Sequence, residues 1–303
     1  MHPAPSIIVF TVMSGLGYGL ATWLSLGMLS PLAGATTLAW LASLASISLG
    51  LLSSTLHLGN PQRAWRAFSQ WRSSWLSREA VMAVATFPPL LWVAGRVVVA
   101  DEPSPIVGPL AALMCVGTVI CTAMIYASLR TVRAWHSWLT PACFLLFSLG
   151  GGALLALVFA GFGPGRIGLL AAAAVLFLAL GGAAKAAWTA RMRAPDPDTS
   201  PETATGLGPI GRVRLLERPH AMESYLTREM VFRVGRKHAD TLRVLAFALS
   251  VLVPVLLLLG VALGVAPAFL ATLAVISHLV GMLAERWLFF AEARHVVSNY
   301  YGA

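Results

Sequence analysis

The chain has 303 residues, of which 58% are hydrophobic and only 11% are charged. A soluble domain carries about 25% charged residues, so this composition excludes a water-soluble globular protein and indicates a membrane protein. The net charge of +9 would suit a nucleic-acid-binding protein, but the distribution of the charge along the chain excludes that class.

Apolar runs of about 20 residues, the length that crosses a bilayer as a helix, recur along the chain. They predict an all-α membrane protein with a bundle of eight transmembrane helices, whereas a β-barrel would show short alternating segments. The first run follows MHPAPS, which has no Lys or Arg, so we expect it to remain as a helix and not to be a cleaved signal. The predicted spans are 6–29, 37–58, 80–100, 106–129, 139–161, 167–189, 242–264 and 267–290.

Positive charge marks one side of this bundle, the side that holds both termini and the loops after the even-numbered spans. All but two of the 21 Lys and Arg residues lie on this basic side, the exceptions being Arg96 and Arg166. Cytoplasmic loops of membrane proteins carry an excess of Lys and Arg. The basic side and both termini are therefore predicted to face the cytoplasm, where they would attract anionic lipid or an acidic partner.

The stretch STLHLGNPQRAW, residues 54–65, ends the second predicted span at His57 and leads into the segment 61–78. We expect this segment to be an amphipathic interfacial helix on the cytoplasmic side, with its tryptophans on one face at the level of the lipid headgroups. A plain membrane anchor and a surface that contacts a partner both remain open. The candidate interface residues here are Arg63, Trp65, Arg66, Trp71, Trp75 and Arg78.

Cysteines and histidines limit the metal chemistry of the chain. Cys115, Cys121 and Cys143 lie within predicted spans without metal-ligand spacing, so this chain alone is not expected to hold an iron–sulfur cluster. No two histidines lie at matching depth in two spans, which disfavours haem b. His278 lies mid-span, and we expect it to be hydrogen-bonded within the bundle or to line a polar cavity.

Small and charged residues within the spans have structural interpretations. Gly15 and Gly19 in SGLGYG lack the strand and helix context of a dinucleotide loop, so they predict close helix packing, as do the glycines of 149–152 and 180–182. Lys185 and the pair Glu285/Arg286 lie near the basic end, where their side chains are expected to snorkel towards water. The chain has no charged residue at mid-span and no internal repeat, which disfavours a transporter.

The chain is predicted to form one domain over residues 1–303, with its longest loop between the sixth and seventh spans, at 190–241. About 193–206 is rich in Pro, Asp, Ser and Thr and is expected to be a flexible linker. The rest of the loop has the mixed charge and apolar spacing of one or two helices on the membrane surface or against a partner. A solvated loop is the alternative.

A group of polar residues is expected near the basic end of the bundle: His57, Glu79, Tyr126 and Arg286. Reducing a quinone takes two electrons and two protons. A histidine can hydrogen-bond a quinone oxygen and exchange a proton near neutral pH, and a nearby glutamate can pass protons to water. The alternative is that His57 and Glu79 cap helix ends, and the residues alone leave both interpretations open.

Three motifs resemble the membrane-anchor subunits of the dimethyl sulfoxide reductase type. The most specific is STLHLGNPQRAWRAFSQWRSSWLSREA, in which a span ends in LHLG, a Pro and an Arg-Ala pair follow, and the next span opens with Ser-x-Glu. RAWHSWLTP, which contains Trp135, is similar to the segment that opens the family's fifth helix. AERWLFFA is similar to the family's ending of helix 8, although Glu285 and Phe290 replace a Gly and a Tyr there.

The resemblance implies an anchor that binds a ferredoxin-like iron–sulfur subunit and a molybdopterin catalytic subunit, and that exchanges electrons with the quinone pool of a bacterial cytoplasmic membrane. The anchor itself would not catalyse the molybdenum reaction. The family's quinone-site His, Glu and helix-4 aromatic fall on His57, Glu79 and Tyr126, to which we add Arg286 and, as a further interface residue, Trp135.

The basic, cytoplasmic side of the chain decides between branches of this family. Respiratory sulfoxide reductases hold their catalytic subunits outside the membrane, so the orientation favours the cytoplasm-facing sulfite dehydrogenase anchors, which pass electrons from sulfite oxidation to quinone. A quinol-oxidising sulfoxide reductase anchor and an anchor for another molybdenum or tungsten enzyme are the alternatives. A transporter or scaffold without a redox role is the rival from another class. Ubiquinone and menaquinone both remain open.

Overall fold

A computed structural model describes residues 4–31, 34–56, 60–194, 200–217 and 238–300. Within these ranges, eight helices are long and apolar enough to cross a membrane, which confirms the predicted eight-helix, all-α architecture. They are α1 (Pro5–Ser25), α2 (Gly34–Thr55), α3 (Trp75–Val99), α4 (Val107–Ala127), α5 (Leu139–Ala160), α6 (Ile167–Arg193), the continuous α8–α9 (Ala239–Ala262) and α10 (Pro267–Ala291).

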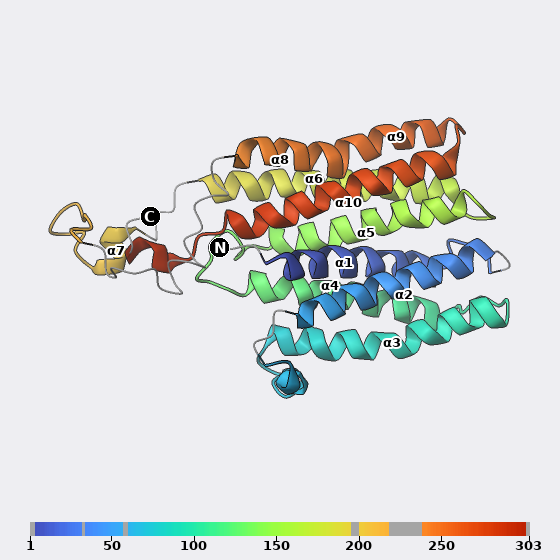
Figure 1. The fold of residues 1–303 in the computed structure, drawn as a ribbon, viewed down its shortest axis with the longest axis horizontal. Coiled ribbons are helices and arrows are strands. Elements are labelled where there is room, and N and C mark those ends of the chain that lie inside the picture. The colour runs from blue at the N-terminus through green and yellow to red at the C-terminus, as the bar shows by residue number, and fades with distance from the viewer. Residues whose placement is uncertain (1–3, 32–33, 57–59, 195–199, 218–237, 301–303) are drawn as a thin grey trace.

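Helix α1 lies at the centre of the bundle and packs against α2, α4, α5 and α10. Helix α3 lies at one edge and packs mainly against α4, while α6, α8 and α9 form the opposite edge (Figure 1). Burial follows this arrangement, because 72% of the most apolar window of α1 is buried but only 33% of that of α3. Most of the surface of α3 is therefore left to lipid.

Glycines allow the closest helix contact of the bundle, between α1 and α5. A Cβ atom on Gly19 would overlap the carbonyl oxygen of Ser148, and one on Gly152 would overlap the backbone of Gly19. Gly181 packs against the ring of Phe147, so α5 and α6 also meet at a glycine. The predicted packing role of these small residues is confirmed.

The seventh membrane helix contains a π-helical turn that was not evident from the sequence. Helix α8 (Ala239–Phe247) and α9 (Val253–Ala262) are joined by η4 (Ala248–Leu252), which is a π-helix. Such a turn leaves carbonyl groups free for other partners. Here α10 uses them: Ser277 donates to the Leu249 carbonyl at 2.8 Å, and the His278 ring lies 2.7 Å from the Ser250 carbonyl.

The interfacial segment after α2 differs from the predicted α-helix. Residues Pro61–Phe68 form a 3₁₀-helix, η1, and turns follow before α3 begins at Trp75. The four aromatic residues of 61–78 therefore do not form one α-helical stripe, because a 3₁₀-helix has three residues per turn and places them differently.

Two further short elements lie outside the spans. Helix α7 (Pro201–Thr205) falls within the predicted linker, and η5 (Val296–Tyr300) follows α10. Residues 207–217 of the predicted surface segment contain no helix, and 218–237 lie outside the described residues.

Candidate functional site

The predicted site residues Glu79, Tyr126 and Arg286 all belong to the basic end of the bundle, where α3 begins and where α4 and α10 end. His57 lies outside the described residues, so its position relative to Glu79 stays a prediction. Helix α2 ends at Thr55, at the same end of the bundle (Figure 1).

Glu79 is buried, with 7% of its surface exposed, and it faces α4. The Thr122 hydroxyl donates a hydrogen bond to Glu79 Oε1. Glu79 is not in the first turn of α3, whose N-cap residue is Ser74. The capping alternative for Glu79 is therefore wrong, because this carboxyl binds a neighbouring helix and not the end of its own.

Tyr126 lies in an aromatic cluster that closes the same end of the bundle. Its ring stacks on Phe144 with a centroid separation of 5.8 Å and meets Trp135, Phe289 and Phe290 edge to face at 5.3 to 5.6 Å. These geometries are favoured by aromatic quadrupoles. The cluster packs Tyr126, which belongs to α4, against residues of α5 and α10.

Arg286 is part of a buried ion cluster with Glu285 and Lys185. Lys185 Nζ lies 2.6 Å from Glu285 Oε1, and Arg286 Nε lies 3.1 Å from Glu285 Oε2. Only 13%, 4% and 2% of the Lys185, Glu285 and Arg286 side chains are exposed. The expectation that they snorkel to water was wrong, because they pair with one another inside the bundle, where an unpaired charge would be costly.

Aromatic rings complete the surroundings of the two cations. Lys185 Nζ lies 3.7 Å from the centroid of Trp188, and Arg286 Cζ lies 3.7 Å from that of Phe144. Cation–π contacts of this kind are stronger when the cation is desolvated. The cluster as a whole carries one more positive than negative charge, and Glu285, one of the departures from the family pattern, binds both cations.

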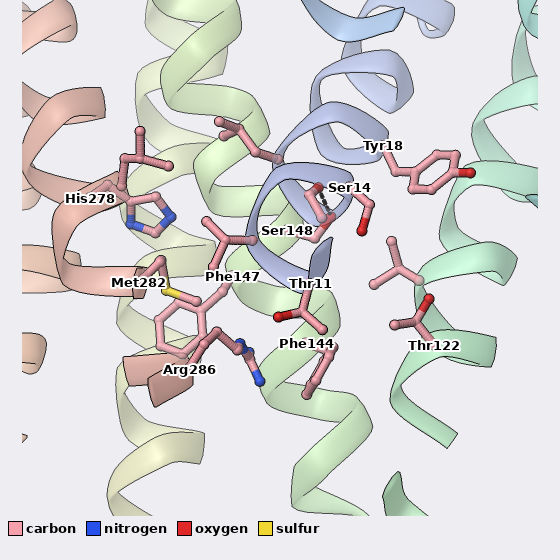
Figure 2. A pocket seen from close by; sticks show the side chains of 15 residues that line it. Thr11, Ser14, Tyr18, Thr122, Phe144, Phe147, Ser148, His278, Met282 and Arg286 are labelled. Atoms are coloured by element: carbon pink, nitrogen blue, oxygen red, sulfur yellow. Dashed lines mark hydrogen bonds between the residues drawn. The ribbon is translucent and has the colours of Figure 1, made fainter. Parts of the chain in front are cut away.

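A small cavity with both apolar and polar lining residues lies inside the bundle beside Arg286 (Figure 2). Its volume is about 30 Å³, which suffices for about two water molecules and not for a quinone ring. It lies between α1, α4, α5 and α10. The polar residues that line it are Thr11, Ser14, Tyr18, Thr122, Ser148, His278 and Arg286.

His278 lies at the deep side of this cavity, and the prediction that it is hydrogen-bonded and lines a cavity is confirmed. Its Nδ1 lies 2.7 Å from the Ser250 carbonyl, which can only accept a hydrogen bond. Nδ1 must therefore carry a proton, and in the neutral ring Nε2 is an acceptor. A Cβ on Gly151 would lie 2.7 Å from Nε2, so only a glycine leaves room for this edge of the ring.

The surface around η1 carries exposed tryptophans, each beside an arginine. Trp65 and Trp71 are 65% and 53% exposed. Guanidinium groups lie 5.7 Å from the ring of Trp65 and 5.4 Å from that of Trp71. Arg78 lies 4.3 Å from the Trp75 ring and also donates to the carbonyls of Trp71 and Arg72. Arg78 therefore holds the turn before α3.

Trp135 lies in the core and not on the interface to which it was assigned. It is 3% exposed, its indole N–H donates to the Phe289 carbonyl at 2.9 Å, and its ring stacks on Phe289. An indole with its N–H satisfied internally stabilises a core position, so Trp135 is not available to a partner in this structure.

The sequence analysis missed Thr122, the pairing of Lys185 with Glu285, and the hydroxyls that line the cavity. Glu79 and Tyr126 were expected at one depth of the bundle. Thr122 lies one helical turn before Tyr126, and this spacing was the signal that could have placed it beside Glu79. The hydroxyls of Thr11, Ser14 and Ser148 donate to helix carbonyls, which is common in membrane helices and gives no signal in sequence.

Fold and site together define a polytopic membrane protein that keeps a buried carboxyl group and a buried ion cluster at one end of an eight-helix bundle. The model of the DMSO reductase anchor subunit (DmsC) family matches residues 1–291. The chain belongs to this family. It is also 31% identical over 325 residues to a sulfite dehydrogenase subunit of Allochromatium vinosum, in an alignment that covers 99% of both chains.

Family membership confirms the predicted class: the chain is a multi-pass membrane anchor subunit of a molybdopterin oxidoreductase complex. Association with catalytic molybdopterin and iron–sulfur subunits follows from that class. Within the described residues, no group of three or more His, Cys, Asp or Glu side chains could hold a metal ion.

Proposed function

We propose that this subunit passes electrons from an iron–sulfur subunit to quinone, and that the electrons come from sulfite oxidation. The observation that carries the quinone site is Glu79, a carboxyl buried between the peripheral helix α3 and α4, with a neutral hydroxyl, that of Thr122, as its described hydrogen-bond partner. The similarity to the sulfite dehydrogenase subunit of Allochromatium vinosum over nearly the whole chain supports sulfite as the source of the electrons.

Quinone reduction would give the residues at the basic end of the bundle different roles. The quinone ring is too large for the internal cavity, so it would bind beside Glu79 at the basic end of α3, close to the end of α2, which His57 follows in sequence. There His57 would hydrogen-bond a quinone oxygen and Glu79 would hold a proton for it. Tyr126 would close the site towards the core, and Arg286 would supply positive charge from the inner side.

The basic side supports the proposed orientation and partners. The Lys and Arg excess favours a cytoplasmic position for this side and both termini. The exposed Trp65 and Trp71, with Arg66 and Arg72 beside them, would form a surface for the iron–sulfur subunit at the end where Glu79 lies. The described part of loop 190–241 extends from the same side (Figure 1).

The test compares two activities of the whole complex. We expect His57→Ala and Glu79→Gln to lower sulfite-to-quinone turnover at least a hundredfold, while sulfite oxidation with an artificial dye, which bypasses the anchor, stays at the native level. Glu102→Gln is the matched control, because Glu102 is 55% exposed and lies at the opposite end of α3. Native quinone turnover in both site variants would refute the assignment.

A further inference from the structure

The cavity between α1, α4, α5 and α10 has mainly apolar walls into which several polar groups reach. An empty cavity is stable when its walls are apolar, whereas a polar cavity of sufficient size holds water that makes two to four hydrogen bonds. Its volume of about 30 Å³ accommodates about two water molecules, and seven of its fifteen lining residues carry a hydroxyl, imidazole or guanidinium group among mainly apolar walls. Water is therefore the ligand that fits its size and chemistry.

Two buried polar groups of the lining lack a described hydrogen-bond partner. Arg286 Nη1 and the Tyr18 hydroxyl are both fully enclosed and have no partner among the described residues. Arg286 is 2% exposed and Tyr18 is 2% exposed, and Figure 2 shows the Arg286 side chain reaching from α10 towards Thr11 and Phe144. An unsatisfied buried donor costs about 1 to 3 kcal/mol, and more when charged, so a water at Nη1 stabilises the site.

The opposite walls of the cavity supply acceptors and a connection to the site. His278 Nε2 is an acceptor, because Nδ1 carries the proton that binds the Ser250 carbonyl. The hydroxyl oxygens of Thr11 and Ser14 keep lone pairs after donating to their own helix. Thr122 lines the cavity and also binds Glu79, so the cavity begins one hydrogen bond away from the proposed proton group.

We propose that the cavity is an internal water site that relays protons between the Glu79–Thr122 pair and His278. This rests on the proposed function of Glu79 as the proton group of the quinone site. A proton enters from hydronium on the basic side through Glu79. Each water accepts one proton and gives up another, so no water is consumed. Nε2 of His278 accepts the proton last, forming an imidazolium that keeps its Nδ1–H bond to Ser250, and the proton returns by the same path to Glu79 when quinone reduction has taken the Glu79 proton.

Met282 makes the water itself measurable, since it lines the cavity and is only 6% exposed. Hydroxyl radicals generated by X-ray pulses from bound water oxidise an adjacent methionine sulfur to the sulfoxide. In the purified complex we expect Met282 to be oxidised, and Thr11→Val with Thr122→Val to reduce this at least threefold. No oxidation of Met282 above the unirradiated level in the native complex would overturn the water site.

The control variant is Thr22→Val with Thr118→Val. Thr22 and Thr118 are buried threonines of α1 and α4 that donate to helix carbonyls as Thr11 and Thr122 do, but they do not line the cavity. We expect Met282 oxidation to be native in this control. An equal loss in the control and in the cavity variant would assign the effect to general unfolding and overturn the proposal.

The relay is tested with Thr11→Val alone, because Thr11 does not touch Glu79. We expect sulfite-to-quinone turnover to fall severalfold with a larger solvent deuterium isotope effect, and dye-coupled turnover to stay native. Unchanged turnover and isotope effect would overturn the relay. If Glu79→Gln keeps native quinone turnover while Met282 is oxidised as expected, the proposed function fails and the water site stands.

Discussion

The buried ion cluster makes a prediction whose sign can be derived from its charges. Native Lys185, Glu285 and Arg286 sum to one positive charge, with Glu285 in contact with both cations at 2.6 and 3.1 Å. Glu285→Met leaves two cations without their anion, whereas Lys185→Met leaves one matched pair. The same Lys185→Met substitution should therefore destabilise the native chain but stabilise the Glu285→Met variant.

The magnitudes follow from the burial of the three groups. Removing the partner of a buried charge costs about 3 to 5 kcal/mol, and all three side chains are at most 13% exposed, so we expect this range for Glu285→Met. Lys185→Met loses one buried ion pair and the contact with Trp188 at 3.7 Å but leaves Glu285 paired with Arg286, so we expect it to cost about 2 to 3 kcal/mol. In the double variant we expect a recovery of about 1 kcal/mol relative to Glu285→Met.

Thermal unfolding in a mild detergent measures this series. Cys115 and Cys143 are buried thiols, so a thiol-reactive dye reports their exposure as the bundle unfolds. At about 2 to 4 °C per kcal/mol, Glu285→Met should lower Tm by about 10 °C, and adding Lys185→Met should raise it again. A double variant less stable than Glu285→Met would refute the charge argument and indicate that packing dominates.

Three further substitutions test the contact between α1 and α5, with its control, and the turn after α10. Gly19→Ala should cost about 3 kcal/mol or more, because its Cβ would overlap the Ser148 carbonyl. The control is Gly95→Ala, whose Cβ meets nothing within 4 Å and which should leave Tm native or slightly higher. Equal changes of Tm in the two variants would contradict the packing argument. Burial lowers the pKa of His295, and its Nδ1 accepts a hydrogen bond from the Val297 N–H in the turn after α10. The neutral ring therefore stabilises this turn above about pH 6.5. Hydrogen exchange at Val297, corrected for intrinsic rate, should accelerate as pH falls below that value, and His295→Phe should abolish the pH dependence.

The eight spans were predictable because a bilayer leaves few choices to a chain. Every backbone group in the hydrocarbon must be satisfied within its own helix, so apolar length alone marks each span. The predicted glycine contacts followed from the same logic, since small residues let helices approach. The basic side followed from the distribution of Lys and Arg, which is independent of packing.

The ion cluster was not predictable from the sequence, because Lys185 and Glu285 are distant along the chain and come together only through the packing of α6 and α10. A lone lysine near a helix end normally snorkels, and only a tertiary partner overrides this preference. The assignment of Trp135 to the interface, which came with the resemblance of RAWHSWLTP, was wrong for a similar reason, because the distant ring of Phe289 stacks on it. The residue spacing of segment 61–78 predicted an α-helix, but residues Pro61–Phe68 form the 3₁₀-helix η1. In so short a segment, the spacing of aromatic residues does not distinguish the two kinds of helix.

Glu79 lies at the boundary between two different surroundings. Its helix, α3, lies at the edge of the bundle and has exposed apolar residues such as Leu91 and Trp92. Two hydrogen bonds join α3 to α4, one between the hydroxyls of Thr86 and Thr118 and one from Thr122 to Glu79. A lipid-soluble quinone can approach α3 from outside, and the cavity reaches Thr122 from inside. Under the proposed function, Glu79 would bind the quinone at this boundary and exchange protons with the cavity through Thr122.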